Sequence, residues 1–263
     1  MKNLFLLFAF SLFTATTNAQ INKKLKLVWS DEFNYQGLPD STKWGYDVGT
    51  GDWGWGNNEQ QYYAKAKAQN VMVGKGVLAI IAQKEKQGDK DYTSTRLSTK
   101  GKFAWNRGRI EIRAKLPKGR GIWPAGWMLG ENQNTVGWPQ CGEIDILEHV
   151  GYDPDTIVGS LHTTAYNHIK GTQKTQRLFI KNLTTVFHSF IVEWDNDKMD
   201  FYLDKQKYLT VPNEHKTDKE WPFHNPMYLL LNVAVGGNWG GSKGIDPNIF
   251  PAKMEIDFVR VYQ

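Results

Sequence analysis

Cysteine is almost missing from this sequence, because only Cys141 occurs among 263 residues. One cysteine cannot form an intramolecular disulfide, which excludes the small disulfide-stabilised folds. The chain is long enough to bury a sizeable core without such cross-links. We expect Cys141 to be a small buried apolar residue rather than a nucleophile, since no His–Asp pattern accompanies it.

A strong excess of positive charge is missing as well. The formal net charge is only +5 at pH 7, and no block of Lys and Arg with interleaved aromatic residues occurs. This composition argues against nucleic acid as a partner. Nothing in the sequence indicates an oligomer, and we expect a monomer.

No apolar run is long enough to predict a membrane span. Residues 1–19 contain Lys2, the short apolar run Leu4–Phe13 and a small residue, Ala19, at a suitable cleavage position. This order is typical of a secretory signal peptide. We predict cleavage after Ala19, a single domain over residues 20–263, and a secreted or periplasmic location.

Helical periodicity is also absent after the N-terminal segment, where no stretch of eleven residues or more shows it. Short apolar stretches instead alternate with Gly, Asn, Asp and Pro, which predicts an all-β fold, an antiparallel two-sheet β-sandwich. An edge strand is expected at Val28–Phe33. The other predicted strands are Val71–Ile81, Gly108–Leu116, Trp123–Leu129, Gly142–His149, Ile157–His162, Phe187–Trp194, Met199–Leu203, Met227–Val235 and Met254–Tyr262.

Three carboxylates gather in one of these strands, at Glu143, Asp145 and Glu148. Side chains alternate between the faces of a strand, so Glu143 and Asp145 share a face while Glu148 would point into the core. A buried unpaired carboxylate is costly. A β-bulge near Ile146–Leu147 returns Glu148 to the face of the other acids, and we predict one there.

This arrangement suits glycoside hydrolysis. With the bulge, the Cα atoms of Glu143 and Glu148 would be roughly 13 Å apart, and their carboxyl groups could approach to about 5 Å, as in retaining glycosidases. Asp145 lies between them and could separate their pKa values. Two other interpretations of the acids stay open from spacing alone, a solvated strand face or a metal site.

Aromatic residues are abundant, with 11 Trp, 11 Tyr and 13 Phe, and such rings can stack on sugars. Trp123 and Trp127 share one strand face, as core residues or as a sugar platform. Trp239 is flanked by glycines and has no evident packing role, so we predict that it binds substrate. Amides, an acid and phenols concentrate in Asn57–Tyr63, and His162 follows the acids on the next strand, so both are candidates for contacts with hydroxyl groups.

The segment Gly142–Glu148 matches the E-x-D-x-x-E signature of glycoside hydrolase family 16, and the sequence resembles the laminarinase-like β-1,3-glucanases of that family. The resemblance covers nearly all of the chain after the signal peptide. It runs through Trp29–Phe33, Asn58–Tyr62, Arg109–Pro117, Trp123–Met128, His149–Asp153, His162–Tyr166, Asn232–Gly237 and Asp257–Gln263.

The resemblance implies a jelly-roll, concanavalin A-like sandwich whose concave sheet forms a glycan cleft, and a retaining mechanism. Glu143 would be the nucleophile and Glu148 the acid and base, while Asp145 would tune the nucleophile. Catalysis needs no cofactor. The positions that would line the substrate subsites or contact sugar hydroxyl groups are Trp123, Trp127, Trp138, Asn57, Glu59, Arg109 and His162.

Relatives of this kind also imply a structural Ca²⁺, held here by Glu32, the carbonyl of Gly76 and Asp257, a set of hard oxygen ligands. The predicted activity is that of a secreted endo-β-1,3-glucanase acting on laminarin-like glucans, with mixed-linkage β-1,3-1,4-glucans as further substrates. Two alternatives stay open. One is a hydrolase of red-algal galactans of the agarase, carrageenase or porphyranase type, and the other is a non-catalytic glycan-binding sandwich.

Overall fold

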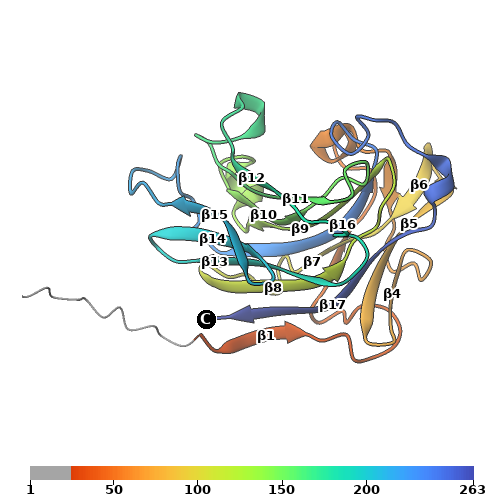
Figure 1. The fold of residues 1–263 in the computed structure, drawn as a ribbon, viewed down its shortest axis with the longest axis horizontal. Coiled ribbons are helices and arrows are strands. Elements are labelled where there is room, and N and C mark those ends of the chain that lie inside the picture. Colours follow the sequence, from red (N-terminus) through yellow and green to blue (C-terminus); the bar gives the residue numbers. More distant parts are fainter. Residues whose placement is uncertain (1–24) are drawn as a thin grey trace, which may run out of the picture.

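The computed structural model describes residues 25–263 as a sandwich of two β-sheets (Figure 1). Residues 1–24, with the predicted signal peptide and its cleavage site, lie outside the described residues. No helix among residues 25–263 is long and apolar enough to cross a bilayer. The two-sheet architecture predicted from the alternating apolar stretches is confirmed.

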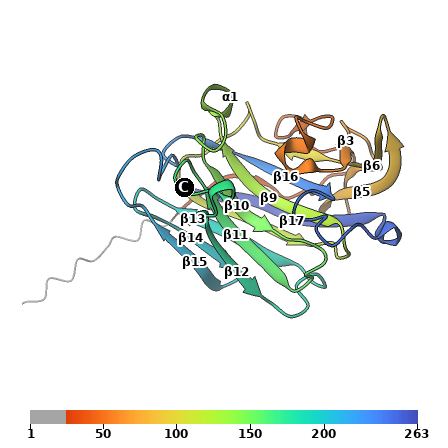
Figure 2. The same cartoon turned by 90° about the horizontal axis from the view of Figure 1, so that it is seen from above.

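One sheet has seven strands, and we call it the front sheet. Most of its strands run side by side across the molecule (Figure 2). Its strands in spatial order are β12 (Lys174–Phe179), β11 (Thr156–His162), β10 (Glu143–Glu148), β9 (Ile122–Gly130), β16 (Met227–Val235), β7 (Arg96–Ser98) and β2 (Gly45–Asp47). The acid-bearing strand β10 therefore lies inside the sheet, with a hydrogen-bonded neighbour on each side.

The other sheet has ten strands, and we call it the back sheet. The main path is β15 (Gln206–Pro212), β14 (Lys198–Leu203), β13 (His188–Trp194), β8 (Gly108–Lys115), β17 (Ala252–Tyr262), β5 (Val77–Gln87), β6 (Lys90–Ser94) and β3 (Gln61–Tyr63). Two further strands attach at its side, β1 (Leu27–Asp31) to β17 and β4 (Val71–Gly74) to β5. The pair β3–β6 is parallel, while the other described strand pairs are antiparallel.

The core lies between the sheets and follows from strand alternation. In β8 the apolar residues Ile110 and Ile112 are fully buried, and in β9 and β10 Met128 and Ile144 are as well. All nine residues of β16 are buried, so neither face of this strand is open to solvent. This large core supports the sandwich without a disulfide, and Cys141 is a free buried thiol as predicted.

One predicted strand was wrong in its extent. Val71–Ile81 is a hairpin of β4 and β5, because Lys75 and Gly76 take positive φ values of 55° and 77° and reverse the chain. Two consecutive positive φ values are what a tight hairpin turn requires. The helical elements are short, namely η1 (Gly54–Asn58), α1 (Gln133–Val136), η2 (His168–Lys170) and η3 (Pro247–Ile249).

Candidate active site

The predicted bulge is present in β10. Pairing with β9 shifts register between Asp145 and Leu147, and pairing with β11 shifts between Asp145 and Glu148. Ile146 and Leu147 are consecutive, yet both are fully buried in the core between the sheets. The extra residue thus places Glu148 on the open face of the front sheet, together with the other two acids.

Glu143 is held by an indole. Trp138 Nε1 donates a hydrogen bond of 2.8 Å to Glu143 Oε2. The other carboxylate oxygen, Oε1, lies 3.9 Å from His162 Nε2, and the Glu143 side chain is 17% exposed. A carboxylate that is fixed by one donor and partly exposed can attack a bound substrate.

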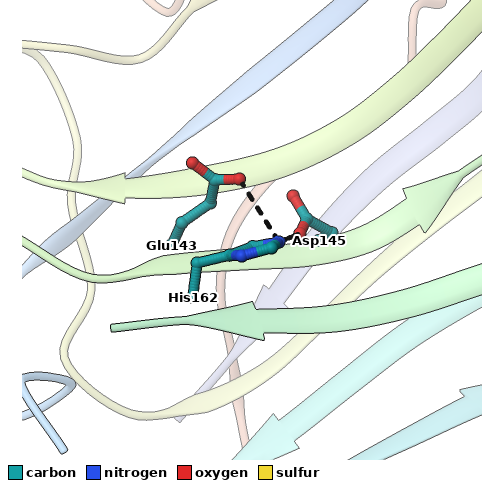
Figure 3. A group of neighbouring side chains, drawn as sticks. All are labelled: Glu143, Asp145 and His162. Atoms are coloured by element: carbon teal, nitrogen blue, oxygen red, sulfur yellow. Dashed lines mark ion pairs between the residues drawn. The ribbon is translucent and has the colours of Figure 1, made fainter. Parts of the chain in front are cut away.

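Asp145 is the most enclosed of the three acids, with its residue only 4% exposed. Its Oδ2 atom lies 3.2 Å from His162 Nε2. His162 is opposite Glu143 in the β10–β11 register, so the imidazole reaches both acids from the neighbouring strand. Figure 3 shows the imidazole directed at both carboxylates.

Glu148 has its own indole donor, since Trp123 Nε1 lies 3.1 Å from Glu148 Oε1. Trp239 packs edge-on against Trp123, with ring centroids 5.5 Å apart. The glycine-rich loop therefore brings Trp239 beside the indole that binds Glu148. Its contact with sugar stays a prediction.

The electrostatics separate the roles of the two glutamates. Burial and the charge of Asp145 raise the pKa of Glu143 to about 8, opposed by His162 and the Trp138 N–H. Burial and the charge of Asp145 also raise the pKa of Glu148, well above its usual range. A raised pKa keeps a carboxyl group protonated, which suits Glu148 to the acid role, while the charge of His162 and the Trp138 N–H favour the ionised form of Glu143, which suits a nucleophile.

His162 supplies the compensating positive charge. Burial disfavours its protonation, but the contact with Asp145 and the charges of Glu143 and Glu148 outweigh burial and raise the pKa to about 9. A protonated imidazole among three acids keeps part of their negative charge in place.

Trp127 stands next to the acids, opposite Asp145 in the β9–β10 register. Its Nε1 donates a 2.8 Å hydrogen bond to Asn232 Oδ1 on β16. The Arg96 guanidinium stacks on the same indole, 4.8 Å from the ring centroid, and on Trp55 at 4.5 Å. The ring of Trp127 is therefore held by a hydrogen bond at its edge and a cation on its face.

Behind this ring lies a buried polar chain that includes Glu59. Asn232 Nδ2 donates to the Tyr63 hydroxyl at 3.1 Å, and that hydroxyl donates to Glu59 Oε2 at 3.1 Å. Gln61 Nε2 also donates to Glu59, at 2.6 Å. Burial raises the pKa of Glu59. Glu59 therefore belongs to the buried hydrogen-bonded chain that holds Asn232 and, through it, Trp127. Asn57 is partly exposed, and its backbone carbonyl accepts a hydrogen bond from a backbone N–H of the glycine-rich loop.

Sequence analysis missed several of these residues. Arg96 and Asn232 are isolated polar residues within apolar strands, and only the sheet order places them beside Trp127. His168 was also missed, and its ring centroid lies 5.2 Å from both Trp138 and His162. The sequence signal that could have identified Arg96 and Asn232 was a charged or amide residue within an otherwise apolar strand.

The prediction that Arg109 contacts substrate was wrong. Arg109 lies on β8 of the back sheet, where it pairs with Glu193 at 2.5 Å and Glu111 at 3.1 Å. Strand alternation gave the correct face, away from the core, but β8 belongs to the other sheet. This arginine is thus remote from the acids of β10.

The residues predicted to hold Ca²⁺ have separate partners. Glu32 accepts two hydrogen bonds from Arg260, at 2.9 and 2.8 Å, and Asp257 pairs with Arg113. Gly76 lies in the β4–β5 turn, and β5 pairs with β17, which carries Asp257. The backbone thus brings these segments together, but the carboxylates must leave their arginines to bind a cation.

Comparison with known proteins agrees with this geometry. The chain is 50% identical over 245 residues to a beta-glucanase of Rhodothermus marinus, covering 90% of this chain and 85% of that protein. The crystal structure of the laminarinase from Rhodothermus marinus superposes with a TM-score of 0.88 at 49% identity, covering 91% of this chain and 97% of the other.

A second structural neighbour is SCLam, described as a non-specific endo-beta-1,3(4)-glucanase and crystallised as a mutant with a glucan oligosaccharide at its active site. It superposes with a TM-score of 0.88 at 46% identity, covering 92% of this chain and 95% of that chain. Residues 58–260 match the model of the glycosyl hydrolases family 16. The chain therefore belongs to glycosyl hydrolase family 16.

Proposed function

We propose that this protein is a retaining endo-β-1,3-glucanase that hydrolyses laminarin-like glucans, and mixed-linkage β-1,3-1,4-glucans as further substrates. One observation carries the proposal: the bulge in β10 sets Glu143 and Glu148 on one face, each held by its own indole N–H. The similarity to laminarinases supports the substrate class.

In the first step, ionised Glu143 attacks the anomeric carbon while Glu148 donates its proton to the departing glycosidic oxygen. A covalent glycosyl–Glu143 ester forms and the aglycone leaves. The raised pKa of Glu148 keeps the proton available for this transfer. Trp138 orients the nucleophile through its N–H.

In the second step, Glu148 is ionised and takes a proton from water, whose oxygen attacks the anomeric carbon and releases Glu143. Two inversions give net retention of the β configuration. Asp145 and protonated His162 balance the charge as Glu143 alternates between carboxylate and neutral ester.

The charges near the acids favour a neutral glucan over a sulfated galactan. A sulfated substrate calls for free cationic side chains to bind its sulfate groups. Arg96, the arginine stacked on Trp127, already pairs with Asp47 at 3.0 Å and is wedged between two indoles. The red-algal galactanase hypothesis therefore has less support than the glucanase.

The test is product analysis on laminarin, barley mixed-linkage glucan, agarose and carrageenan, with Glu143→Ser alongside. We expect short oligosaccharides from laminarin with the native protein and none with the variant. Cleavage confined to a galactan would keep the mechanism and overturn the substrate. Retained binding without cleavage of any polymer would instead favour a non-catalytic glycan-binding protein.

We also propose that the protein acts outside the cytoplasm as a monomer after cleavage near Ala19, because a polymeric glucan is too large to enter a cell intact. Mass spectrometry of the exported protein and its sedimentation velocity test these two points. A mature chain that retains the leader, or a dimer, would contradict them.

A structural Ca²⁺ at Glu32, Gly76 and Asp257 is a further part of the proposal. A ligand that binds only the folded state at 100 times its Kd adds about 2.7 kcal/mol of stability. A chelator should accordingly lower the melting temperature by several degrees, and Ca²⁺ should restore it. An unchanged melting temperature would show that Glu32 and Asp257 stay paired with Arg260 and Arg113 and bind no cation.

A further inference from the structure

We propose that Glu143, Asp145 and His162 form an inhibitory Zn²⁺ site. One ligand atom from each residue can be chosen so that all three lie within 4.8 Å of one another. Figure 3 shows these three side chains converging on one point from β10 and β11. This inference goes beyond the proposed hydrolysis, because it concerns a ligand that stops it.

The geometry needs only a small contraction to bind a metal ion. Zinc bonds to imidazole and carboxylate are about 2.0–2.2 Å long, so ligand atoms of a tetrahedral site lie about 3.4 Å apart. His162 Nε2 already lies 3.2 Å from Asp145 Oδ2 and 3.9 Å from Glu143 Oε1. Rotation of the longer, partly exposed Glu143 side chain can close the remaining gap.

A second observation points to a ligand. Asp145 is 4% exposed, and its buried Oδ2 atom has no hydrogen-bond partner of good geometry among residues 25–263. A buried carboxylate oxygen without such a partner is costly. That atom faces His162 Nε2 at 3.2 Å, which balances its charge while the imidazole is protonated. A Zn²⁺ ion between the two atoms would replace that proton, because a metal-bound imidazole is neutral.

The ligand types select the metal. Two carboxylates and one imidazole suit Zn²⁺, which accepts mixed N and O ligands, whereas Ca²⁺ and Mg²⁺ prefer oxygen alone. Three protein ligands leave a fourth position for water. A Zn²⁺ ion here would occupy the nucleophile itself, so it should compete with substrate.

The site should bind more weakly than a structural zinc site. Metal-binding histidines usually donate their other N–H to an acceptor, and loss of that partner typically costs 10–100-fold in affinity. Within the described part of the chain, buried His162 Nδ1 has no such acceptor. Reversible inhibition that a chelator relieves is therefore expected.

The first measurement is calorimetric titration of the full protein with ZnCl₂, which does not depend on hydrolysis. We expect His162→Gln and Glu143→Gln each to weaken the tightest binding at least about tenfold, since each loses a ligand. His188→Gln is the matched control, because His188 also pairs with an aspartate, Asp204, at 2.7 Å. Its Zn²⁺ affinity should equal that of the native protein.

The second measurement is kinetic. Zn²⁺ should raise the KM for laminarin without changing kcat, a chelator should restore the original KM, and Mg²⁺ at equal ionic strength should have no effect. Unchanged affinity in both site variants, or a loss of binding in His188→Gln, would overturn the proposal, as would inhibition that substrate cannot relieve. Failure of the glucanase proposal would appear as inactivity on every glucan while the calorimetric result stood.

Discussion

Strands β8 and β10 look alike in sequence and differ in what they do. Both alternate charged with apolar residues, as Arg109-Ile-Glu-Ile-Arg in β8 and Glu143-Ile-Asp-Ile in β10. In β8 the charges have opposite signs and pair with each other and with the neighbouring strands. In β10 they have one sign, and the partners are indoles and one imidazole.

The two strands differ in how their charges are compensated. Opposite charges on the back sheet neutralise one another near solvent, where such ion pairs contribute little to the stability of the fold. Like charges on β10 are enclosed, which raises the pKa of Glu143 and of Glu148. Nothing in folding rewards that arrangement, which supports the catalytic role proposed for these acids.

The largest expected effect comes from removing the acid. Glu148→Ala should lower the rate on laminarin by about 10²–10⁴-fold, the usual contribution of general acid–base catalysis. On a substrate with an activated leaving group, azide should restore turnover and yield a β-glycosyl azide, identified by NMR. The back-sheet control Glu193→Ala should stay within about twofold of the native rate. An α-configured azide would refute the retaining assignment.

A smaller effect is expected from removing the indole donor of Glu143. Trp138→Phe keeps a ring but loses the N–H, and a hydrogen bond to a charged group contributes about 1.5–3 kcal/mol. We expect kcat/KM to fall roughly 10–100-fold in steady-state assays.

The control for this variant is Trp194→Phe. Trp194 Nε1 donates to the backbone oxygen of Asn106 at 3.0 Å in the back sheet. Its removal should leave kcat/KM unchanged. Equal losses in the two variants would mean that Trp138 acts only through packing.

The pH dependence tests His162. Its positive charge lowers the pKa of Glu143, so His162→Gln should raise that pKa and move the acid limb of the kcat/KM profile to higher pH. His188→Gln should leave the profile in place. An unchanged acid limb in His162→Gln would show that the imidazole does not influence the pKa of Glu143.

The pH dependence of folding stability should also depend on His162. The pKa of His162 is raised from 6.5 to about 9 in the folded state, so protonation stabilises the fold fully below pH 6.5. That contribution is lost as pH rises through about 9. The urea midpoint of the native protein should accordingly fall toward that of His162→Gln over this range.

The smallest effect is expected on the back sheet. Arg109→Gln breaks its ion pairs with Glu111 and Glu193, and partly exposed pairs contribute about 0.2–1 kcal/mol. Urea denaturation should show a loss of this size, with KM for laminarin unchanged. A large rise in KM would reinstate Arg109 as a substrate contact.

The comparison also explains what sequence could predict. The spacing of Glu143, Asp145 and Glu148 required the bulge, because burying Glu148 was the alternative, and that inference needed only one strand. The error at Arg109 arose because the alternation of side chains along a strand shows which residues face away from the core, but not which of the two sheets the strand joins. Arg96 and Asn232 were missed since the sheet order that joins β7, β16 and β9 depends on contacts far apart in the chain.

The stacked arrangement of Trp55, Arg96 and Trp127 has a thermodynamic consequence for binding. Immobilising a flexible side chain at an interface costs about 0.5–1.5 kcal/mol. Trp127 is already fixed by Asn232 at its edge and Arg96 on its face before any sugar arrives. If a glucan docks on this ring, as the sequence predicts, the cost of ordering the Trp127 side chain has already been met during folding, and binding should be stronger by that amount.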